Sequence, residues 1–216
     1  MSDKIHEYRG KAVVIHFDGA RCIHSRNCVL GHPEVFVANA KGAWVHPDAG
    51  SPEEIAMVIH ACPSGALTYE RLDDAAQEAP PLVNVVRVLE NGPLAFRAEL
   101  DISGEEKCIR ATLCRCGASQ TKPFSDGTHT AAKVIATGEP PVTDPGPVLE
   151  TKNGPLKAIP QRNGPLYVQG NLEICSGTGH TVQRCTEAWL CRCGHSGNKP
   201  FCDGTHKKIG FEAAGA

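Results

Sequence analysis

The chain has 216 residues, of which 21% are charged, and its formal net charge at pH 7 is −2. This balance argues against a nucleic-acid-binding surface, which usually carries an excess of Lys and Arg. No apolar run is long enough to span a membrane, and residues 1–22 lack the apolar core of a secretory signal. We therefore expect a cytoplasmic protein with no nucleic-acid or membrane partner.

The first predicted domain covers residues 1–78. The segments "KAVVIHF" (11–17) and "GALTYERL" (65–72) are rich in β-branched and apolar residues, which is typical of strands. The stretch "DDAAQEAPP" (73–81) has the composition of a linker. The pattern predicts a small α+β domain that ends before this linker.

A helix is predicted between the two strands. Ser51 is its N-cap, Pro52 takes the first helical position, and Glu54 lies three residues after the cap, which completes a capping box. The following apolar residues recur at helical spacing and so share one face. They are Ile55, Val58, Ile59 and Cys62.

Three cysteines of this domain resemble part of a ferredoxin ligand set. Cys22 and Cys28 lie in "CIHSRNC", and Cys62 begins "CPSGAL", with the Cys-Pro pair that usually ends such a set. Three thiolates suit a 3Fe–4S cluster, or a 4Fe–4S cluster with His24, Ser25 or solvent at the fourth iron. The alternative is three unligated core thiols, because Cys62 belongs to the apolar helix face.

The rest of the chain is an internal repeat. Residues 114–129 and 191–206 agree at twelve of sixteen positions, and each stretch follows Asn-Gly-Pro-Leu and a strand-like segment. A Pro- and Gly-rich stretch separates the copies. Turn residues of this kind predict a small β-rich module per copy, at residues 82–139 and 148–216.

The second copy carries a complete set of four metal-binding side chains. Cys191 and Cys193 are two residues apart, Cys202 follows nine residues later, and His206 lies four residues beyond it. Four residues make about one helical turn, so Cys202 and His206 are expected on one face of a short helix capped by Asp203. Three thiolates and one imidazole suit either Zn²⁺ or an iron–sulfur cluster.

The first copy has one exchange in this set. Cys114, Cys116 and His129 match the second copy, but Ser125 replaces the third cysteine. Ser125 could ligate iron as an alkoxide, the cluster could have water or a vacancy there, or the site could be empty. We expect an occupied but more labile site, because an abandoned site would not need to keep His129 in register.

The remaining cysteines are expected to pack in the core rather than to bind metal. Cys108 could stand in for the missing thiolate, but it has a counterpart, Cys185, in the copy that already has its full set. Cys175 is likewise spare, since small buried thiols are common in cores.

The repeated motif closely resembles the CDGSH iron–sulfur family, the mitoNEET-like or NEET proteins. The resemblance rests on Cys191-x-Cys193, Ser196, Pro200 and the run from Cys202 to His206, and it covers residues ~82–216. It implies a redox-active 2Fe–2S cluster held by three Cys and one His. Two motifs in one chain resemble the Miner2-like members, which implies two modules about a pseudo-twofold axis.

The N-terminal stretch "DGARCIHSRNCVLGHPEVF", with the later "CPSGAL", is similar to the divergent mono-cluster ferredoxin domain often fused to CDGSH modules. We therefore expect an α+β chain with a ferredoxin-like domain followed by two β-rich modules. A monomer with an internal pseudo-dimer is the expected assembly.

The expected function is one-electron transfer with redox partner proteins. Cluster storage, transfer to apo-acceptors, or redox and pH sensing is a second possibility, because the lone His ligand must be deprotonated to bind. A zinc-bound structural adaptor is a third. We expect no enzyme, since the sequence shows no nucleophile–base pair, phosphate loop or dinucleotide fingerprint.

Overall fold

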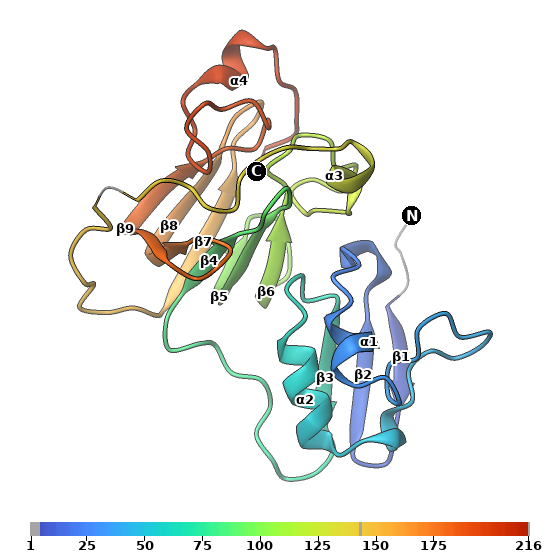
Figure 1. The fold of residues 1–216 in the computed structure, drawn as a ribbon. Coiled ribbons are helices and arrows are strands. Elements are labelled where there is room, and N and C mark those ends of the chain that lie inside the picture. The colour runs from blue at the N-terminus through green and yellow to red at the C-terminus, as the bar shows by residue number, and fades with distance from the viewer. Residues whose placement is uncertain (1–4, 143, 216) are drawn as a thin grey trace. The chain divides into compact units, whose positions relative to one another are not determined.

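The computed structural model describes residues 5–142 and 144–215, and the chain divides into two compact units, Met1–Ala79 and Pro80–Ala216. Most of the regular structure is β, and the few helices are short (Figure 1). The α+β expectation therefore fits the first unit better than the whole chain. Among the described residues, none of the helices has the length and apolarity that a membrane crossing requires.

The first unit is a three-stranded antiparallel sheet with helices packed on it. Its strand order is β1-β2-β3. The elements in chain order are β1 (His6–Arg9), β2 (Val13–Phe17), η1 (Gly19–Arg21), α1 (Asn27–Gly31), η2 (Pro47–Ala49), α2 (Pro52–His60) and β3 (Leu67–Arg71). The two strands predicted from the sequence, β2 and β3, pair with each other.

Helix α2 begins as its sequence predicts. The Ser51 hydroxyl accepts from the Glu54 amide at 3.3 Å, and the Ser51 amide donates to the Glu54 carboxylate at 3.0 Å, so the capping box is complete. Ile55 and Ile59 are fully buried against the sheet, and Cys62 is buried just beyond the helix end. The apolar face is therefore the one that the spacing predicted.

The second unit contains two three-stranded meanders. The elements are β4 (Val85–Val88), β5 (Leu94–Ile102), β6 (Cys108–Leu113), α3 (Thr128–Ala131), β7 (Pro155–Pro160), β8 (Leu166–Cys175), β9 (Thr181–Leu190) and α4 (Thr205–Lys208). Each meander leads into one copy of the Cys-Arg-Cys stretch. The β-rich module predicted for each copy is confirmed.

The two meanders exchange strands to close a small barrel. Strand β4 pairs in parallel with β8, and β7 pairs in parallel with β5, while β4–β5 and β7–β8 are antiparallel. These four pairings join β4, β5, β7 and β8 into a closed ring, with β6 and β9 added at its outside. Each module thus gives its first strand to the middle strand of the other, which is the reciprocal pattern that a two-fold relation produces.

Alternation along the middle strands fills the barrel. In β5, every second residue from Leu94 to Ile102 is buried, and Leu166, Val168, Leu172 and Ile174 of β8 are buried in the same core. Cys108 and Cys185 pack against this core, as predicted for residues outside the ligand sets. Cys175, at the end of β8, is buried as well.

Candidate metal centres

The four candidate donors of the second module lie in two pairs. Strand β9 ends at Leu190, and the Cys191 and Cys193 sulfurs directly after it are 3.9 Å apart. The loop then returns, so that the Cys202 amide donates to the Trp189 carbonyl at 2.8 Å. Cys202 Sγ lies 3.3 Å from Nδ1 of His206, which belongs to α4. The loop therefore holds one thiol pair and one thiol–imidazole pair.

The first module keeps the same two pairs. The Cys114 and Cys116 sulfurs are 3.5 Å apart, and Ser125 Oγ lies 3.4 Å from His129 Nδ1. The Ser125 amide donates to the Thr112 carbonyl at 2.9 Å, which matches the anchor of Cys202 in the second module. Ser125 thus takes the place of Cys202, and the other donors and the backbone anchor of the loop are the same in both modules.

Paired donors suit a cluster with two irons, because each iron of a binuclear cluster takes two protein ligands, as the His pair of a Rieske centre shows. A single zinc ion instead needs four donors around one point. Across residues 5–142 and 144–215, no group of three or more His, Cys, Asp or Glu side chains is placed to hold a metal ion. The distances within the pairs group the four donors of each module two plus two.

Conserved turns within the repeat fix both loops. The Asp203 carboxylate accepts from the Gly197 amide at 2.8 Å and from the Thr205 amide at 2.9 Å, and Asp126 does the same in the first module. The hydrogen bonds from Thr205 and Gly197 hold the pKa of Asp203 far below its ordinary value. Asp203 thus anchors two backbone amides of the loop, but its prediction as the N-cap is wrong by one residue: the N-cap is Gly204, with φ +85°.

The two thiols of the first module are hydrogen-bonded to each other. The hydrogen bond from Cys116 lowers the pKa of Cys114 to about 6, against the opposing effect of burial, and the same bond raises the pKa of Cys116. One thiolate is therefore already present near neutral pH, which is the form that binds metal. Burial lowers the pKa of His129, so its imidazole is neutral and can offer a lone pair.

The two Cys-Arg-Cys stretches meet at their backbones. Cys116 and Cys193, which are equivalent in the repeat, form an antiparallel bridge. Gly117 has φ +82°, and a Cβ there would lie 2.8 Å from the Cys193 carbonyl oxygen. Gly194, with φ +83°, packs in the same way against Cys116. Both glycines are required for this close approach, which places the two candidate sites side by side.

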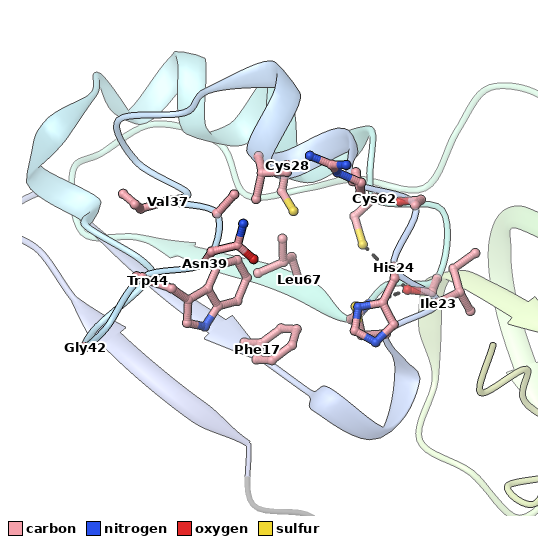
Figure 2. Close-up of a pocket in the computed structure, with 18 residues that line it drawn as sticks. Phe17, Ile23, His24, Cys28, Val37, Asn39, Gly42, Trp44, Cys62 and Leu67 are labelled. Atoms are coloured by element: carbon pink, nitrogen blue, oxygen red, sulfur yellow. Dashed lines mark hydrogen bonds between the residues drawn. The ribbon is translucent and has the colours of Figure 1, made fainter. Parts of the chain in front are cut away.

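The three cysteines of the first unit line one cavity of about 600 Å³. Cys22 follows η1, Cys28 lies in α1, and Cys62 follows α2, and Figure 2 shows the Cys28 and Cys62 sulfurs directed into the cavity. Burial raises the pKa values of Cys22 and Cys28, and the neighbouring Cys62 raises them further. All three cysteines predicted from the sequence therefore line the same cavity.

Two side chains near these thiols remain candidates for a fourth ligand. His24 and Ser25 both line the cavity, and His24 Nδ1 lies 4.0 Å from Cys22 Sγ. His24 has φ 55°, a backbone conformation that is uncommon for a residue other than glycine. The opposite wall is aromatic, formed by Phe17 and Trp44, whose ring centroids are 4.9 Å apart (Figure 2). This aromatic wall was not predicted from the sequence.

The sequence interpretation also passed over Arg115 and Arg192, the middle residues of the two Cys-Arg-Cys stretches. Both are almost completely buried. Their repetition at equivalent positions was the available signal, since a buried charge kept in both copies needs a structural reason.

Comparison with known proteins finds a family match in each unit. The family described as "Divergent 4Fe-4S mono-cluster" matches residues 8–72, and the family described as "Iron-binding zinc finger CDGSH type" matches residues 86–130 and 163–207. The chain is also 40% identical over 62 residues to the uncharacterized protein YjdI of Escherichia coli strain K12 and of strain O157:H7. The match covers 29% of this chain and 80% of each relative.

Proposed function

Because the chain carries a divergent 4Fe–4S mono-cluster domain and two CDGSH-type iron-binding modules, and so belongs to the iron–sulfur cluster-binding proteins, we propose that it transfers single electrons. The observation that carries this proposal is the two-plus-two arrangement of donors in both modules. Bound iron–sulfur clusters supply one-electron redox chemistry. The chain's own residues hold the clusters, set their charge and bring two of them close together.

In the second module, Cys191 and Cys193 bind one iron of a 2Fe–2S cluster, and Cys202 and His206 bind the other. The donor atoms within these two pairs are 3.9 Å and 3.3 Å apart. Asp203 fixes the loop through two backbone amides. The module therefore provides a preformed ligand frame.

In the first module, Cys114 and Cys116 bind one iron, and Ser125 and His129 face the other. A hydroxyl is a harder ligand than a thiolate and must lose a proton from a weak acid, so this second 2Fe–2S cluster is held less tightly. The two modules therefore differ in how tightly they hold a cluster, although their loops place the four donor residues in the same way.

In the first unit, Cys22, Cys28 and Cys62 bind a third cluster, of the 3Fe–4S or 4Fe–4S type. His24, Ser25 or solvent would complete the ligand set of the 4Fe–4S form, and both side chains line the cavity. The cavity is larger than three thiols need for packing, which favours a cofactor over unligated core cysteines. A redox partner protein is the proposed source or acceptor of electrons, and the cytoplasm is the proposed location.

Transfer of a cluster to an apo-acceptor is the second candidate function. The specific observation that favours it is Ser125, because a weakly held cluster is more easily released. Both functions need the same ligands. In the first an electron leaves the protein, and in the second the whole cluster leaves it. Reduction by a reductase should leave the iron content unchanged, whereas cluster transfer should lower it as the acceptor gains colour.

Iron and sulfide analysis with EPR on the purified full-length chain tests the proposal. We expect a red-brown protein that loses one EPR signal in Cys202→Ala, another in Cys114→Ala and a third in Cys62→Ala. The matched control is Cys185→Ala, which removes a core thiol and should keep every signal. A colourless chain with stoichiometric zinc would instead support a structural adaptor and refute electron transfer.

A further inference from the structure

The first module has a surface hollow beside its candidate metal ligand His129. The volume of the hollow is about 430 Å³. Its lining includes His129 and Thr130 of α3, Lys133 and Val134 just after that helix, and Glu90 from the turn after β4. An imidazole that is expected to bind iron therefore forms part of a recess open to solvent.

His206, the equivalent residue of the second module, is less accessible. Its relative exposure is 9%, whereas His129 is only partly buried. Within the described part of the second module, the corresponding hollow is lined by Arg162, Asn163 and residues 212–215, and His206 is not among the lining residues. The modules thus differ in access to the imidazole as well as in their ligand sets.

One exchange in the repeat coincides with this difference in access. The Val134 amide donates to the His129 carbonyl at 3.0 Å, and the Phe211 amide donates to the His206 carbonyl at 3.0 Å, so Val134 and Phe211 hold equivalent positions. The Phe211 ring is partly buried and lies 5.7 Å from the Arg192 guanidinium. Valine is much smaller than phenylalanine and fills less of the same space. The hollow therefore lies where the first module has the smaller side chain.

The hollow also carries a cation that an incoming anion can meet. Lys133 is exposed, and among the described residues its ammonium group makes no hydrogen bond or ion pair. The Glu90 carboxylate, which lines the same hollow, accepts a hydrogen bond from the Gly138 amide. Because opposite charges attract, Lys133 favours an anionic ligand at this place.

We propose that the hollow admits an external thiolate, which displaces His129 from the metal centre of the first module. This inference rests on the proposed function, since it supplies a route for release of the first module's cluster. A thiolate is a softer ligand than the imidazole or the Ser125 hydroxyl. One sulfur–iron bond forms and the bond from iron to His129 Nδ1 breaks, so no electron is transferred. The thiolate belongs to a low-molecular-weight thiol or to a cysteine of an acceptor protein.

Histidine labelling of the metal-free chain tests the access without any cluster. Diethyl pyrocarbonate acylates accessible imidazole nitrogens, and peptide mass spectrometry gives the rate at each histidine. His129 should react faster than His206, Val134→Phe should slow His129, and Phe211→Val should speed up His206. Val148→Phe is the matched control, because Val148 is 63% exposed and does not line the hollow. Equal rates at the two histidines would overturn the inference.

Visible absorption of single-site proteins tests the displacement itself. Cys202→Ala with Cys62→Ala leaves the first module's site, and Cys114→Ala with Cys62→Ala leaves the second module's site. With N-acetylcysteine as the probe, the absorption of the first-site protein should decay several-fold faster as the thiol concentration rises. Val134→Phe should remove most of this dependence, and the second-site protein should acquire it with Phe211→Val. A dependence that Val134→Phe leaves unchanged would overturn the inference.

The charge of Lys133 and the source of the thiolate are tested with the same decay. Lys133→Gln should slow the thiol-dependent decay at low ionic strength and affect it less at high ionic strength, because salt screens the attraction. N-acetylcysteine is then compared with an apo-ferredoxin at equal cysteine concentration. Faster decay with N-acetylcysteine assigns the hollow to small thiols, and faster decay with the apo-ferredoxin assigns it to acceptor proteins. A decay that responds to neither would overturn the inference.

Failure of the proposed function is distinguishable from failure of this inference. If the first-site protein binds no iron, the proposal of a second cluster fails, and the labelling rates of His129 and His206 still decide whether the hollow gives access. If it binds iron but does not respond to thiols, the proposed function stands and the inference fails. Melting temperatures check that the variants fold. Should Val134→Phe not fold, Val134→Leu should give a smaller change of the same sign.

Discussion

The contact between the two Cys-Arg-Cys stretches depends on glycine, so Gly117→Ala should damage both sites at once. Alanine at φ +82° costs about 1–2 kcal/mol, because the Cβ crowds the backbone in the left-handed region. The same Cβ would lie 2.8 Å from the Cys193 carbonyl oxygen, and such overpacking costs about 1–3 kcal/mol more. The expected loss of unfolding free energy is therefore roughly 2–5 kcal/mol.

Gly127→Ala is a matched control in the same module. Gly127 has φ +83°, but nothing lies within 4 Å of the position its Cβ would take. It should cost only the backbone term of about 1–2 kcal/mol. Both variants include the cost of a left-handed backbone, but only Gly117→Ala also disturbs the contact between the modules. The difference between their losses of unfolding free energy therefore measures the cost of disturbing that contact.

Thermal and urea unfolding of the metal-free chain measures both costs. A loss of 1 kcal/mol lowers the melting temperature by roughly 2–4 °C in a protein of this size, so the variants should be clearly separated. Visible absorption of the loaded protein should show both CDGSH-type sites weakened in Gly117→Ala. Equal melting temperatures for Gly117→Ala and Gly127→Ala would refute the reasoning, because the intermodule contact would then contribute nothing.

The other predictions concern single side chains. Ser125→Cys should lengthen the half-life of the first site's visible absorption toward that of the second, and an unchanged half-life would mean that position 125 does not face iron. Ser51→Ala should lower the unfolding free energy by about 1 kcal/mol, since it removes the capping box of α2; urea unfolding measures this loss. Hydrogen bonds from Arg71 hold the pKa values of Asp73 and Glu53 below their ordinary values. Their stabilisation is thus present above the unfolded-state pKa of about 4 and is lost as the pH falls through the lower folded-state value. Melting temperatures between pH 7 and pH 3 should fall less steeply in Asp73→Asn than in the natural chain, and parallel curves would contradict the prediction.

Local features of the fold were predictable because neighbouring residues determine them. The capping box of α2 involves Ser51 and Glu54, three residues apart, and its outcome does not depend on distant contacts. The donor pairs were predictable for a similar reason, since each pair spans two to four residues. The N-cap of α4 was wrong by one position because Asp203 and Gly204 both make helix-start contacts there.

Contacts between segments that are distant in the sequence could not be predicted from neighbouring residues. The parallel pairings β4–β8 and β5–β7 link residues 88 and 56 positions apart, and no turn sets their register. The carbonyl partners of Arg115 come from segments on both sides of it in the sequence, so its burial depends on contacts about 20 residues away that the neighbouring residues do not reveal.

The asymmetry between the modules is possible because both belong to one chain. Two identical chains related by a two-fold axis must carry identical sites, so an exchange at one site appears at both. In this chain the barrel keeps the reciprocal pairings of such a dimer, while Ser125 and Cys202 occupy equivalent places. The arginines differ in the same manner, since Arg115 has four carbonyl partners and Arg192 has one. The exchange at Ser125 acts on the first site alone, because it replaces a thiolate by a weaker ligand. A cluster there would be more easily lost than its neighbour, so the two adjacent centres would release their clusters in a fixed order.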